Sequence, residues 1–314
     1  MNADGPSSTD ALPLVSAVLP TRGRPDLVRL SVQGVINQDY AGRIELVVVH
    51  DQEEVDTTLT DLATERRTVG VVRTQRSSGL AAARNAGLSH VHGDFVASCD
   101  DDDVWHPAKI RLQMERMIAE PDLVVLGTGI RLLFDDRTVD WPGDSARVSR
   151  AALLRSRRKE LHSSTLLMRR WVFDAVGGYD EQLPAGYAED YEWLLRLCTK
   201  GEIGVVNEPL ADIRKNTTSW FRERSEVVAE ALEYLLRIHP ELTQSRPGHA
   251  RILGQVAFAH ATLGHRRTAL HWAVRALSRW PVAPHAVLAL VTALTGLDPL
   301  RSLRLTRFFG RGIT

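Results

Sequence analysis

Short apolar segments alternate with amphipathic stretches through the first hundred residues of this chain. Their spacing predicts four strands with two helices between them, the strands at residues 14–19, 44–49, 69–73 and 95–98 and the helices at 26–37 and 79–89. Strands that alternate with helices build a mostly parallel sheet, which collects its ligands at the carboxyl ends of its strands. The sequence therefore predicts an α/β fold, a Rossmann-like sheet flanked by helices, with a functional site at one sheet edge.

Length and composition indicate a globular protein. The 314 residues are 44% apolar and 25% charged, which excludes a disordered or collagen-like chain and suffices for two domains. Two cysteines, Cys99 and Cys198, cannot staple a chain of this size, and its start lacks the pattern of a signal peptide. The longest apolar run, 286–297, is shorter than the roughly 20 residues that cross a bilayer. We therefore expect a cytoplasmic protein and a packed helix at this run.

The character of the sequence changes twice along the chain. Residues 1–13 are rich in Ser, Asp, Gly and Pro, which predicts a disordered lead-in. Residues 14–221 carry the α/β pattern, which continues beyond Pro107 with a helix to Ile118, strands at 123–126, 129–134 and 163–168, and a helix at 189–199. From Arg222 onward the pattern is helical. We place the domain boundary there and expect an all-helical region at 222–314.

The helical region contains one predicted hairpin. Its helices span about residues 250–263 and 266–279, separated by Gly264 and stopped by Pro281, a spacing that fits one tetratricopeptide-type repeat. A single repeat cannot bury its own apolar face. We therefore expect the hairpin to pack on the first domain, on flanking helices, or on a second copy of the chain in a homodimer.

Charge is unevenly distributed, although the formal net charge of the chain is zero. Residues 246–314 contain ten arginines, no lysine and one acid, so this part carries +9 and the rest −9. The basic tail is either a solvated helix surface or a docking surface for an anion. Its segment 301–309 suits either peripheral contact with an anionic membrane or a docked terminal helix. Nucleic acid is not an expected partner, because aromatic platforms are missing apart from Phe308 and Phe309.

Four consecutive aspartates, Asp100, Asp101, Asp102 and Asp103, follow the predicted strand at 95–98. Like charges about 4 Å apart repel by roughly 4 kcal/mol per pair at an effective dielectric near 20, so the run needs a positive partner. A divalent cation supplies one, and oxygen ligands select hard ions such as Mg²⁺ or Mn²⁺. The other interpretation is a solvated acidic loop or helix start. The position at the sheet edge favours the metal site.

Further polar residues converge on the same edge. Pro20, Thr21 and Arg22 end the first predicted strand, Asp51 ends the second, and Arg84 lies in the helix after the third. A nucleotide needs an acid or backbone group for its base, an arginine for base or phosphate, and a metal for the diphosphate. The sequence has neither a GxxxxGK[ST] nor a GxGxxG glycine loop, so the metal must hold the phosphates.

Together these segments resemble the inverting family 2 glycosyltransferases of the GT-A fold. The resemblance rests on residues 18–22, 48–51, 79–87 and 100–107, followed in order by Gly177-Gly178-Tyr179-Asp180-Glu181 and Glu189-Asp190-Tyr191. It covers about residues 14–220, and the ordered combination is more specific than any one motif. It implies a GT-A-like catalytic domain, a nucleotide-sugar donor, a DxD metal site and a carboxylate base at the start of a late helix.

The resemblance also implies a role for each matched residue. Asp100 and Asp102 match the outer acids of the DxD motif, with Asp102 the metal ligand and Asp100 nearer the ribose, and Asp103 assists, so the metal is implied at Asp102, Asp100 and Asp103. Asp190 matches the general base, with Glu189 next to it. The nucleotide pocket is implied at Pro20, Thr21, Arg22, Asp51, Arg84, Asp100 and Asp101.

Two positions depart from the family pattern. The usual pair of acids after the second strand is His50-Asp51 here, which bears on the specificity for the nucleotide base. The histidine often found near the end of the domain is Asn216 here, after Ile213-Arg214-Lys215, which bears on whether that loop reaches the metal.

The implied reaction is a direct displacement at the anomeric carbon of the sugar. The acceptor hydroxyl loses its proton to Asp190, while a Lewis-acidic metal stabilises the negative charge on the leaving nucleoside diphosphate. One displacement inverts the anomeric configuration. For Glu189 and Asp190 the alternative is ordinary first-turn helix electrostatics.

Two other function classes stay open. A nucleotidyltransferase on the same fold would release pyrophosphate, and residues 21–25 weakly resemble the loop that it needs. A binding or scaffold protein would use the helical hairpin beside an inactive catalytic domain, although the intact acids argue against it. The sequence leaves open the donor, a UDP-, dTDP- or GDP-sugar, and the acceptor, a glycan, a lipid-linked molecule or a small molecule.

Overall fold

The computed structural model describes residues 12–74, 79–143, 146–215 and 224–297. These residues form two compact units. The sheet unit comprises the described residues of 12–149, 158–180 and 189–215, and the helical unit comprises those of 150–157, 181–188 and 224–297. Two short segments from the α/β part of the sequence therefore belong to the helical unit. Most of the predicted lead-in and the arginine-rich segment 301–309 lie outside the described residues.

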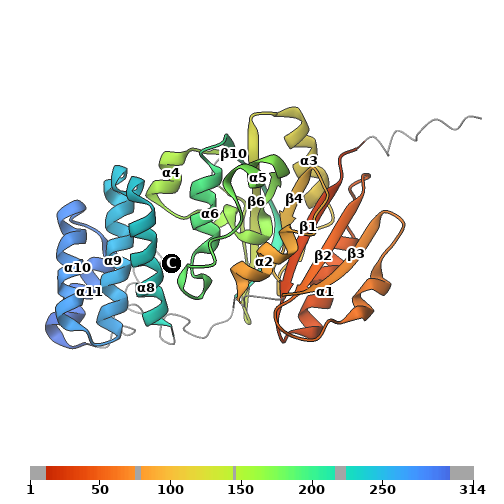
Figure 1. Ribbon diagram of the computed structural model, residues 1–314. Coiled ribbons are helices and arrows are strands. Elements are labelled where there is room, and N and C mark those ends of the chain that lie inside the picture. The colour runs from red at the N-terminus through yellow and green to blue at the C-terminus, as the bar shows by residue number, and fades with distance from the viewer. Residues whose placement is uncertain (1–11, 75–78, 144–145, 216–223, 298–314) are drawn as a thin grey trace, which may run out of the picture. The chain divides into compact units, whose positions relative to one another are not determined.

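One ten-stranded sheet forms the centre of the sheet unit (Figure 1). Its strand order is β3 (Arg67–Arg73), β2 (Ile44–His50), β1 (Val15–Thr21), β4 (Phe95–Ser98), β9 (Leu167–Arg169), β6 (Leu123–Leu133), β10 (Glu202–Arg214) and β5 (Val104–Trp105), with β7 (Thr138–Trp141) beside β6 and β8 (Arg147–Val148) beside β10. The first four strands in this order run parallel, as the alternating pattern predicts. The other half is mixed, because β9 is antiparallel to both of its neighbours whereas β10 is parallel to β6.

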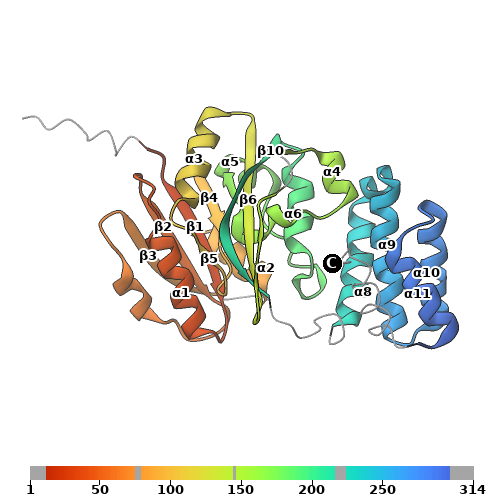
Figure 2. The ribbon, with the colours of Figure 1, turned by 180° about the vertical axis from the view of Figure 1, so that it is seen from behind.

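Helices cover both faces of this sheet. On one face lie α1 (Pro25–Ile36) and α3 (Lys109–Ala119), and on the other lie α2 (Leu80–Leu88), α5 (Arg170–Val176) and α6 (Glu189–Leu197) (Figures 1 and 2). Every residue of β1 is buried because the strand is covered on both sides, which explains its mainly apolar sequence. Gly87 of α2 permits close packing, since a Cβ there would meet Val18 Cγ1 at 2.3 Å and Val49 Cγ2 at 2.9 Å.

The second half of the sheet differs from the prediction at β6, β9 and β10, and the short strands β5, β7 and β8 were not predicted. The two strands expected at 123–126 and 129–134 are one strand, β6, because Gly127 and Gly129 fit close to the Glu160 and Glu208 carbonyl oxygens rather than ending it. The strand expected at 163–168 begins only at Leu167, after the 3₁₀ turn η3 (Ser163–Thr165). The sequence pattern did not reveal β10, whose register is irregular around Pro209.

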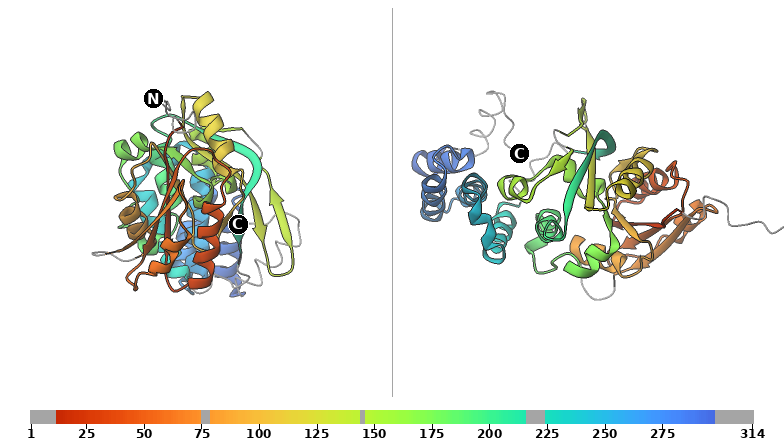
Figure 3. Two further views of the ribbon diagram at one scale, coloured as in Figure 1. Left: turned by 90° about the vertical axis from the view of Figure 1, so that its right-hand side faces the viewer. Right: turned by 90° about the horizontal axis from the view of Figure 1, so that it is seen from above.

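The sheet unit also contains two further 3₁₀ helices, η1 (Thr57–Leu62) and η2 (Lys159–Leu161). The helical unit consists of α4 (Arg150–Arg155), η4 (Pro184–Gly186), α8 (Ser225–Ile238), η5 (Pro240–Gln244), α9 (Arg246–Thr262), α10 (Arg266–Arg279) and α11 (Pro284–Thr295). The right panel of Figure 3 shows the four longer helices nearly end-on.

Small side chains form the core of the helical unit. Helices α9 and α10 make a hairpin around Gly264, whose φ of +78° is left-handed and favours glycine. Alanines dominate the buried cluster that α11 shares with them, namely Ala250, Ala257, Ala261, Ala269, Ala273, Ala276, Ala283, Ala286, Ala289 and Ala293. The apolar run at 286–297 therefore belongs to a packed helix, α11, as far as the chain is described. Within the described part of the chain, every helix is too short or too polar to cross a membrane.

Candidate active site

The loops after β1, β2 and β4 meet at one edge of the sheet. Thr21 and His50, the last residues of β1 and β2, are partners in the parallel register. The Thr21 hydroxyl donates to Asp101 Oδ2 over 2.9 Å, and Arg22 Nη1 donates to Asp51 Oδ2 over 3.3 Å. The structure therefore brings together these four residues, which the sequence predicts in the nucleotide pocket. Pro20, the fifth of this group, is buried within β1 itself.

Asp51 is held at the start of α2. Its Oδ2 accepts a hydrogen bond from the backbone N–H of Gly79 at 3.0 Å, and its Oδ1 accepts one from the Thr74 hydroxyl at 3.2 Å. The preceding His50 is buried, and its Nδ1 lies 3.2 Å from Glu53 Oε1. The family pattern has two acids after the second strand, and this chain has His50 in place of the first. Glu53 therefore brings a second carboxylate next to His50.

The guanidinium of Arg24 neutralises two of the four aspartates. Its Nη1 lies 2.9 Å from Asp101 Oδ1 and 2.8 Å from Asp102 Oδ2, and its side chain is 45% exposed. Burial raises the pKa of Asp102, Arg24 opposes this rise, and the neighbouring carboxylates reinforce it. The acid run therefore has an arginine as a resident cationic partner, a possibility that the sequence analysis missed.

The other two aspartates face the turn that precedes β9. Asp100 Oδ2 accepts from the Ser163 hydroxyl at 2.7 Å, and Asp103 Oδ2 accepts from the Ser164 hydroxyl at 2.6 Å. Asp103 Oδ1 accepts from the backbone N–H of Arg214, at the end of β10, at 3.2 Å. These bonds explain why residues 163–165 form a turn instead of a strand, since the turn directs two serine hydroxyls toward the acids.

His162 completes a group of three potential metal ligands. The ligand atoms of Asp100, Asp103 and His162 all lie within 4.8 Å of one another. Two carboxylates offer the hard oxygen ligands that Mg²⁺ and Mn²⁺ prefer, and the imidazole adds a nitrogen. This donor set fits a divalent cation. Asp102, which the resemblance implies as the metal ligand, lies outside the group and contacts Arg24 instead.

Sequence reasoning missed His162 because it belongs to no recognisable motif. Its only signal is its place directly before a segment predicted as a strand, at the carboxylate-rich edge of the sheet. Asn216, the other position considered for the metal, lies outside the described residues.

Arg84 connects the acid run to the start of α6. Its side chain is 1% exposed, and its two terminal nitrogens donate to Asp100, over 2.5 Å, and to Glu189. The guanidinium also lies 5.1 Å from the centre of the Tyr179 ring. This position differs from the role that the resemblance implies, beside Asp51 in the pocket for the nucleotide base.

The Gly177-Gly178-Tyr179 motif brings α6 to Arg84. Asn85 Oδ1 accepts from the Tyr179 backbone N–H at 2.8 Å, and Asn85 Nδ2 donates to the Tyr179 carbonyl at 2.9 Å. A Cβ on Gly178 would meet Asn85 Oδ1 at 2.2 Å, so only glycine permits this approach. Trp193 of α6 donates to the Gly177 carbonyl over 2.9 Å. These motif residues therefore fix the position of α6 relative to α2.

Burial and Arg84 move the pKa values of two acids in opposite directions. Burial alone would raise the pKa of Asp100, but Arg84, His162 and the Ser163 hydrogen bond lower it to about 2. Burial raises the pKa of Glu189 to about 7, with Arg84 opposing and the adjacent Asp190 reinforcing the rise. Groups with such perturbed pKa values cluster at functional sites.

Asp190 occupies the second position of α6 and is half-buried. Its Oδ1 accepts from the Tyr191 backbone N–H at 2.7 Å. Burial lowers the pKa of His162, while the charges of Asp100 and Asp190 raise it. Asp190 therefore lies within electrostatic range of His162, one of the three potential metal ligands.

Comparisons with known proteins agree with this geometry. The sequence profile of glycosyl transferase family 2 matches residues 16–174, half of the chain. A UDP-Glc:alpha-D-GlcNAc-diphosphoundecaprenol beta-1,3-glucosyltransferase of Escherichia coli is 30% identical over 105 residues, which cover 33% of this chain and 41% of that enzyme. The chain spans about a quarter to a half of the length of the first curated relatives that it matches.

Two solved structures share the fold. Staphylococcus aureus TarS, residues 1–349 in complex with UDP, is 16% identical with a TM-score of 0.59, over 90% of this chain and 92% of that one. The mannosyltransferase PcManGT of Pyrobaculum calidifontis, in complex with GDP-Man and Mn²⁺, is 19% identical with a TM-score of 0.56, over 96% of this chain and 86% of that one. The predicted GT-A-like α/β architecture with a helical C-terminal region is confirmed.

Proposed function

The chain belongs to glycosyl transferase family 2, and from this premise we propose that it is a metal-dependent inverting enzyme, which moves a sugar from a nucleotide diphosphate sugar to an acceptor hydroxyl. The observation that carries the proposal is the position of Asp190. This carboxylate acts electrostatically on His162, which together with Asp100 and Asp103 offers a site for a divalent cation. A base and a cation close to each other are what a single displacement at the anomeric carbon requires.

A nucleotide-sugar donor is supported by the neighbours and by the Asp51 pocket. The related structures hold UDP, UDP-GlcNAc and, with Mn²⁺, GDP-Man. Asp51 is buried at the end of β2, beside Arg22, where its oxygens can accept from the N–H groups of a base ring. Glu53 offers a further carboxylate near His50. We propose that these residues bind the nucleoside part of the donor.

Asp100, Asp103 and His162 are the residues that would hold the cation. A bound Mg²⁺ or Mn²⁺ supplies Lewis acidity, which stabilises negative charge on a departing diphosphate. The chain orients these ligands through Ser163 and Ser164, whose hydroxyls donate to the two carboxylates. Arg84 holds Asp100 from the opposite side. This framework fixes the orientation of both carboxylates.

Asp190 is a better general base than Glu189. The Glu189 side chain is 9% exposed and accepts from the buried Arg84, so an acceptor hydroxyl has little access to it. Asp190, the next residue, is half-buried at the start of α6. We assign proton removal from the acceptor hydroxyl to Asp190 and the positioning of Arg84 to Glu189. The acceptor is proposed to be a saccharide, free or lipid-linked, and the E. coli relative is named for a lipid-linked one, alpha-D-GlcNAc-diphosphoundecaprenol.

A donor screen tests the proposal. The full chain is incubated with UDP-, dTDP- and GDP-sugars in the presence of Mn²⁺, Mg²⁺ or EDTA, and the nucleotide products are separated. We expect metal-dependent release of a nucleoside diphosphate from at least one donor, and inversion at the anomeric carbon once an acceptor is found. Release of pyrophosphate would indicate a nucleotidyltransferase. Absence of any turnover together with retained partner binding would indicate a scaffold protein.

A further inference from the structure

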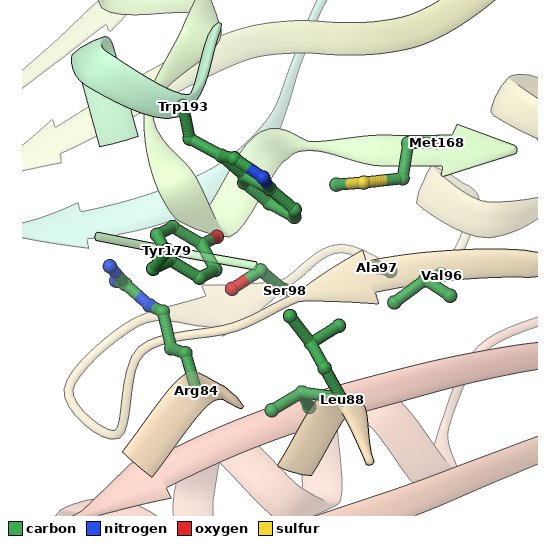
Figure 4. A pocket seen from close by; sticks show the side chains of 9 residues that line it. Arg84, Leu88, Val96, Ala97, Ser98, Met168, Tyr179 and Trp193 are labelled. Carbon is green, nitrogen blue, oxygen red and sulfur yellow. The ribbon is translucent and has the colours of Figure 1, made fainter. Parts of the chain in front are cut away.

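A small cavity in the sheet unit is lined by Arg84 together with residues of β4, α2 and α6. The space open to the centre of a water-sized sphere is about 10 Å³. Figure 4 shows Arg84, Ser98 and Tyr179 grouped at one end and apolar side chains, including Met168, at the other. A cavity needs roughly 10–15 Å³ of such space for one water molecule. The cavity therefore has the size of a single water and is too small for a substrate.

Three polar atoms around this cavity lack hydrogen-bond partners among the described residues. They are Arg84 Nε, Ser98 Oγ and Tyr179 Oη. The three residues are buried, with 1%, 5% and 4% of their surfaces exposed, so bulk water does not satisfy them. Burial raises the pKa of the Tyr179 phenol, whereas Arg84 and the nearby Ser98 hydroxyl lower it, but the two hydroxyls form no well-aligned hydrogen bond.

Such atoms are costly to leave unpaired. A buried donor or acceptor without a partner loses the hydrogen bonds that it makes to water in the unfolded chain, and buried water molecules typically satisfy two to four such groups. The donors and acceptors here are complementary to one water. The Arg84 Nε–H donates to the water oxygen, and the water hydrogens are donated to the two hydroxyl oxygens, each of which can accept.

We propose that this cavity holds one internal water, which bridges Arg84 Nε, Ser98 Oγ and Tyr179 Oη and so fixes the orientation of the Arg84 guanidinium. The other two nitrogens of that guanidinium already hold Asp100 and Glu189. With the water in place, all three nitrogens of Arg84 are engaged. Ser98 and Tyr179 are therefore positioning residues that act on the acids through Arg84, and this catalytic consequence rests on the proposed function.

The cavity does not resemble a site for an ion. Its only charged lining residue is Arg84, which excludes a cation, and its remaining lining residues are apolar apart from Ser98, Tyr179 and the Trp193 ring. The Trp193 Nε1–H is engaged by the Gly177 carbonyl. The geometry requires a neutral ligand with one heavy atom, which both donates and accepts hydrogen bonds.

Two structural measurements test the water without any activity assay. A high-resolution crystal structure of the wild-type chain should show one ordered water within about 3.2 Å of all three atoms. In solution, the Arg84 Nε–H should exchange slowly, and Tyr179→Phe and Ser98→Ala should each accelerate this exchange at least tenfold. Met168→Leu, which changes the same cavity without removing a polar group, should leave the exchange rate unchanged.

A dry cavity in the crystal, with a direct Ser98–Tyr179 hydrogen bond, would overturn the proposal. Exchange of the Arg84 Nε–H that is the same in wild type, Ser98→Ala and Tyr179→Phe would overturn it as well. If Tyr179→Phe fails to fold, Ser98→Ala carries the test alone, because it removes only one oxygen atom. These readouts stay informative even if no donor is ever turned over.

A kinetic measurement tests the positioning role. Once a donor is identified, Tyr179→Phe should lower kcat by about tenfold and leave the KM for the donor within twofold, because the acids are misoriented while the nucleotide pocket is intact. Met168→Leu should retain wild-type kcat. An unchanged kcat in Tyr179→Phe, with the water lost from its crystal structure, would show that the water is structural only.

Discussion

Arg84 donates to the carboxylate of Asp100 over 2.5 Å from a side chain that is 1% exposed. The same guanidinium also holds Glu189, so one buried cation joins the loop after β4 to the first turn of α6. Breaking a buried ion pair by removing one partner is strongly destabilising, because the remaining charge stays buried without compensation. The arrangement of Asp100 and Glu189 in the candidate site therefore depends on the buried Arg84.

We expect Arg84→Met to destabilise the protein by about 3–5 kcal/mol and to abolish transfer, because two buried acids lose their cation. Arg84→Lys should recover part of the stability and little of the activity, since an ammonium group cannot hold two carboxylates in a fixed fork. Urea unfolding and nucleoside diphosphate release measure the two effects. Arg111→Met, which removes an exposed arginine with two acidic neighbours, is the control and should unfold at the wild-type urea concentration. Wild-type stability in Arg84→Met would contradict the bridging role.

The parallel half of the sheet could be predicted from the sequence because β1, β2 and β4 are short, mainly apolar segments between turn residues. β1 and β2 are buried on both faces, so their residue pattern leaves no alternative to a central strand. The same reasoning failed at β6, where Gly127 looked like a strand end although it only makes room for the Glu160 carbonyl. It failed again at β10, whose apolar pattern is broken near Pro209.

The candidate site could be located but not assembled from the sequence. Asp51 and the four aspartates directly follow predicted parallel strands. Their backbone positions therefore lie at the same edge of the sheet, independent of their side-chain contacts. The partners of each acid depend on long-range contacts that leave no local pattern. His162 is 59 residues from Asp103, and Arg24 reaches Asp101 and Asp102 from another loop. The negative charge of the four aspartates alone suggested that one divalent cation neutralises all of them. In the structure, Arg24 and Arg84 neutralise part of this charge.

The structure and the family resemblance predict different metal ligands, His162 and Asp102 respectively. We expect His162→Ala to weaken the binding of Mn²⁺ at least tenfold and Asp102→Ala to weaken it less, because Asp102 is engaged by Arg24. The resemblance to the family predicts the reverse order. Titration calorimetry with Mn²⁺ alone decides between them. Asp140→Ala, at an exposed ion pair with Arg131, is the control and should bind Mn²⁺ like the wild type.

An isosteric substitution of Asp190 tests its assignment as the general base. Asp190→Asn should lower the rate of transfer by about 10²–10⁴-fold, the usual contribution of a general base, and leave donor affinity within threefold. Product release and donor titration measure these two quantities. Glu189→Gln serves as the comparison and should instead lower stability, because Arg84 loses a carboxylate partner. Wild-type turnover in Asp190→Asn would mean that another group accepts the proton.

Lys109 gives the stability of the protein a pH dependence. Its side chain is fully buried, with Nζ 2.8 Å from Gln113 Oε1 and 4.1 Å from the centre of the Trp105 ring. Burial lowers its pKa to about 7 from 10.5, against a small opposing effect of Cys99. The folded state therefore binds fewer protons than the unfolded state between pH 7 and about 10, so stability should rise with pH there, by up to about 1.4 kcal/mol per unit.

Lys109→Met should remove this rise and stabilise the protein most at pH 7 and below, where the wild type buries a charged amine. Urea midpoints measured from pH 6.5 to 9.5 give both slopes. The exposed Lys200 provides the matched variant, Lys200→Met, which should keep the wild-type slope. Equal slopes in wild type and Lys109→Met would show that the buried amine stays protonated throughout this range.

The backbone N–H of Arg214 donates to Asp103, 111 residues earlier in the chain. On the ribosome, the acid run is therefore synthesised long before the strand that completes its hydrogen bonds. A nascent chain that has grown only to residue 174, where the family match ends, already carries Asp100, Asp103 and His162 but not β10. Cation capture should accordingly begin only late in translation, after the segment that closes the sheet has emerged.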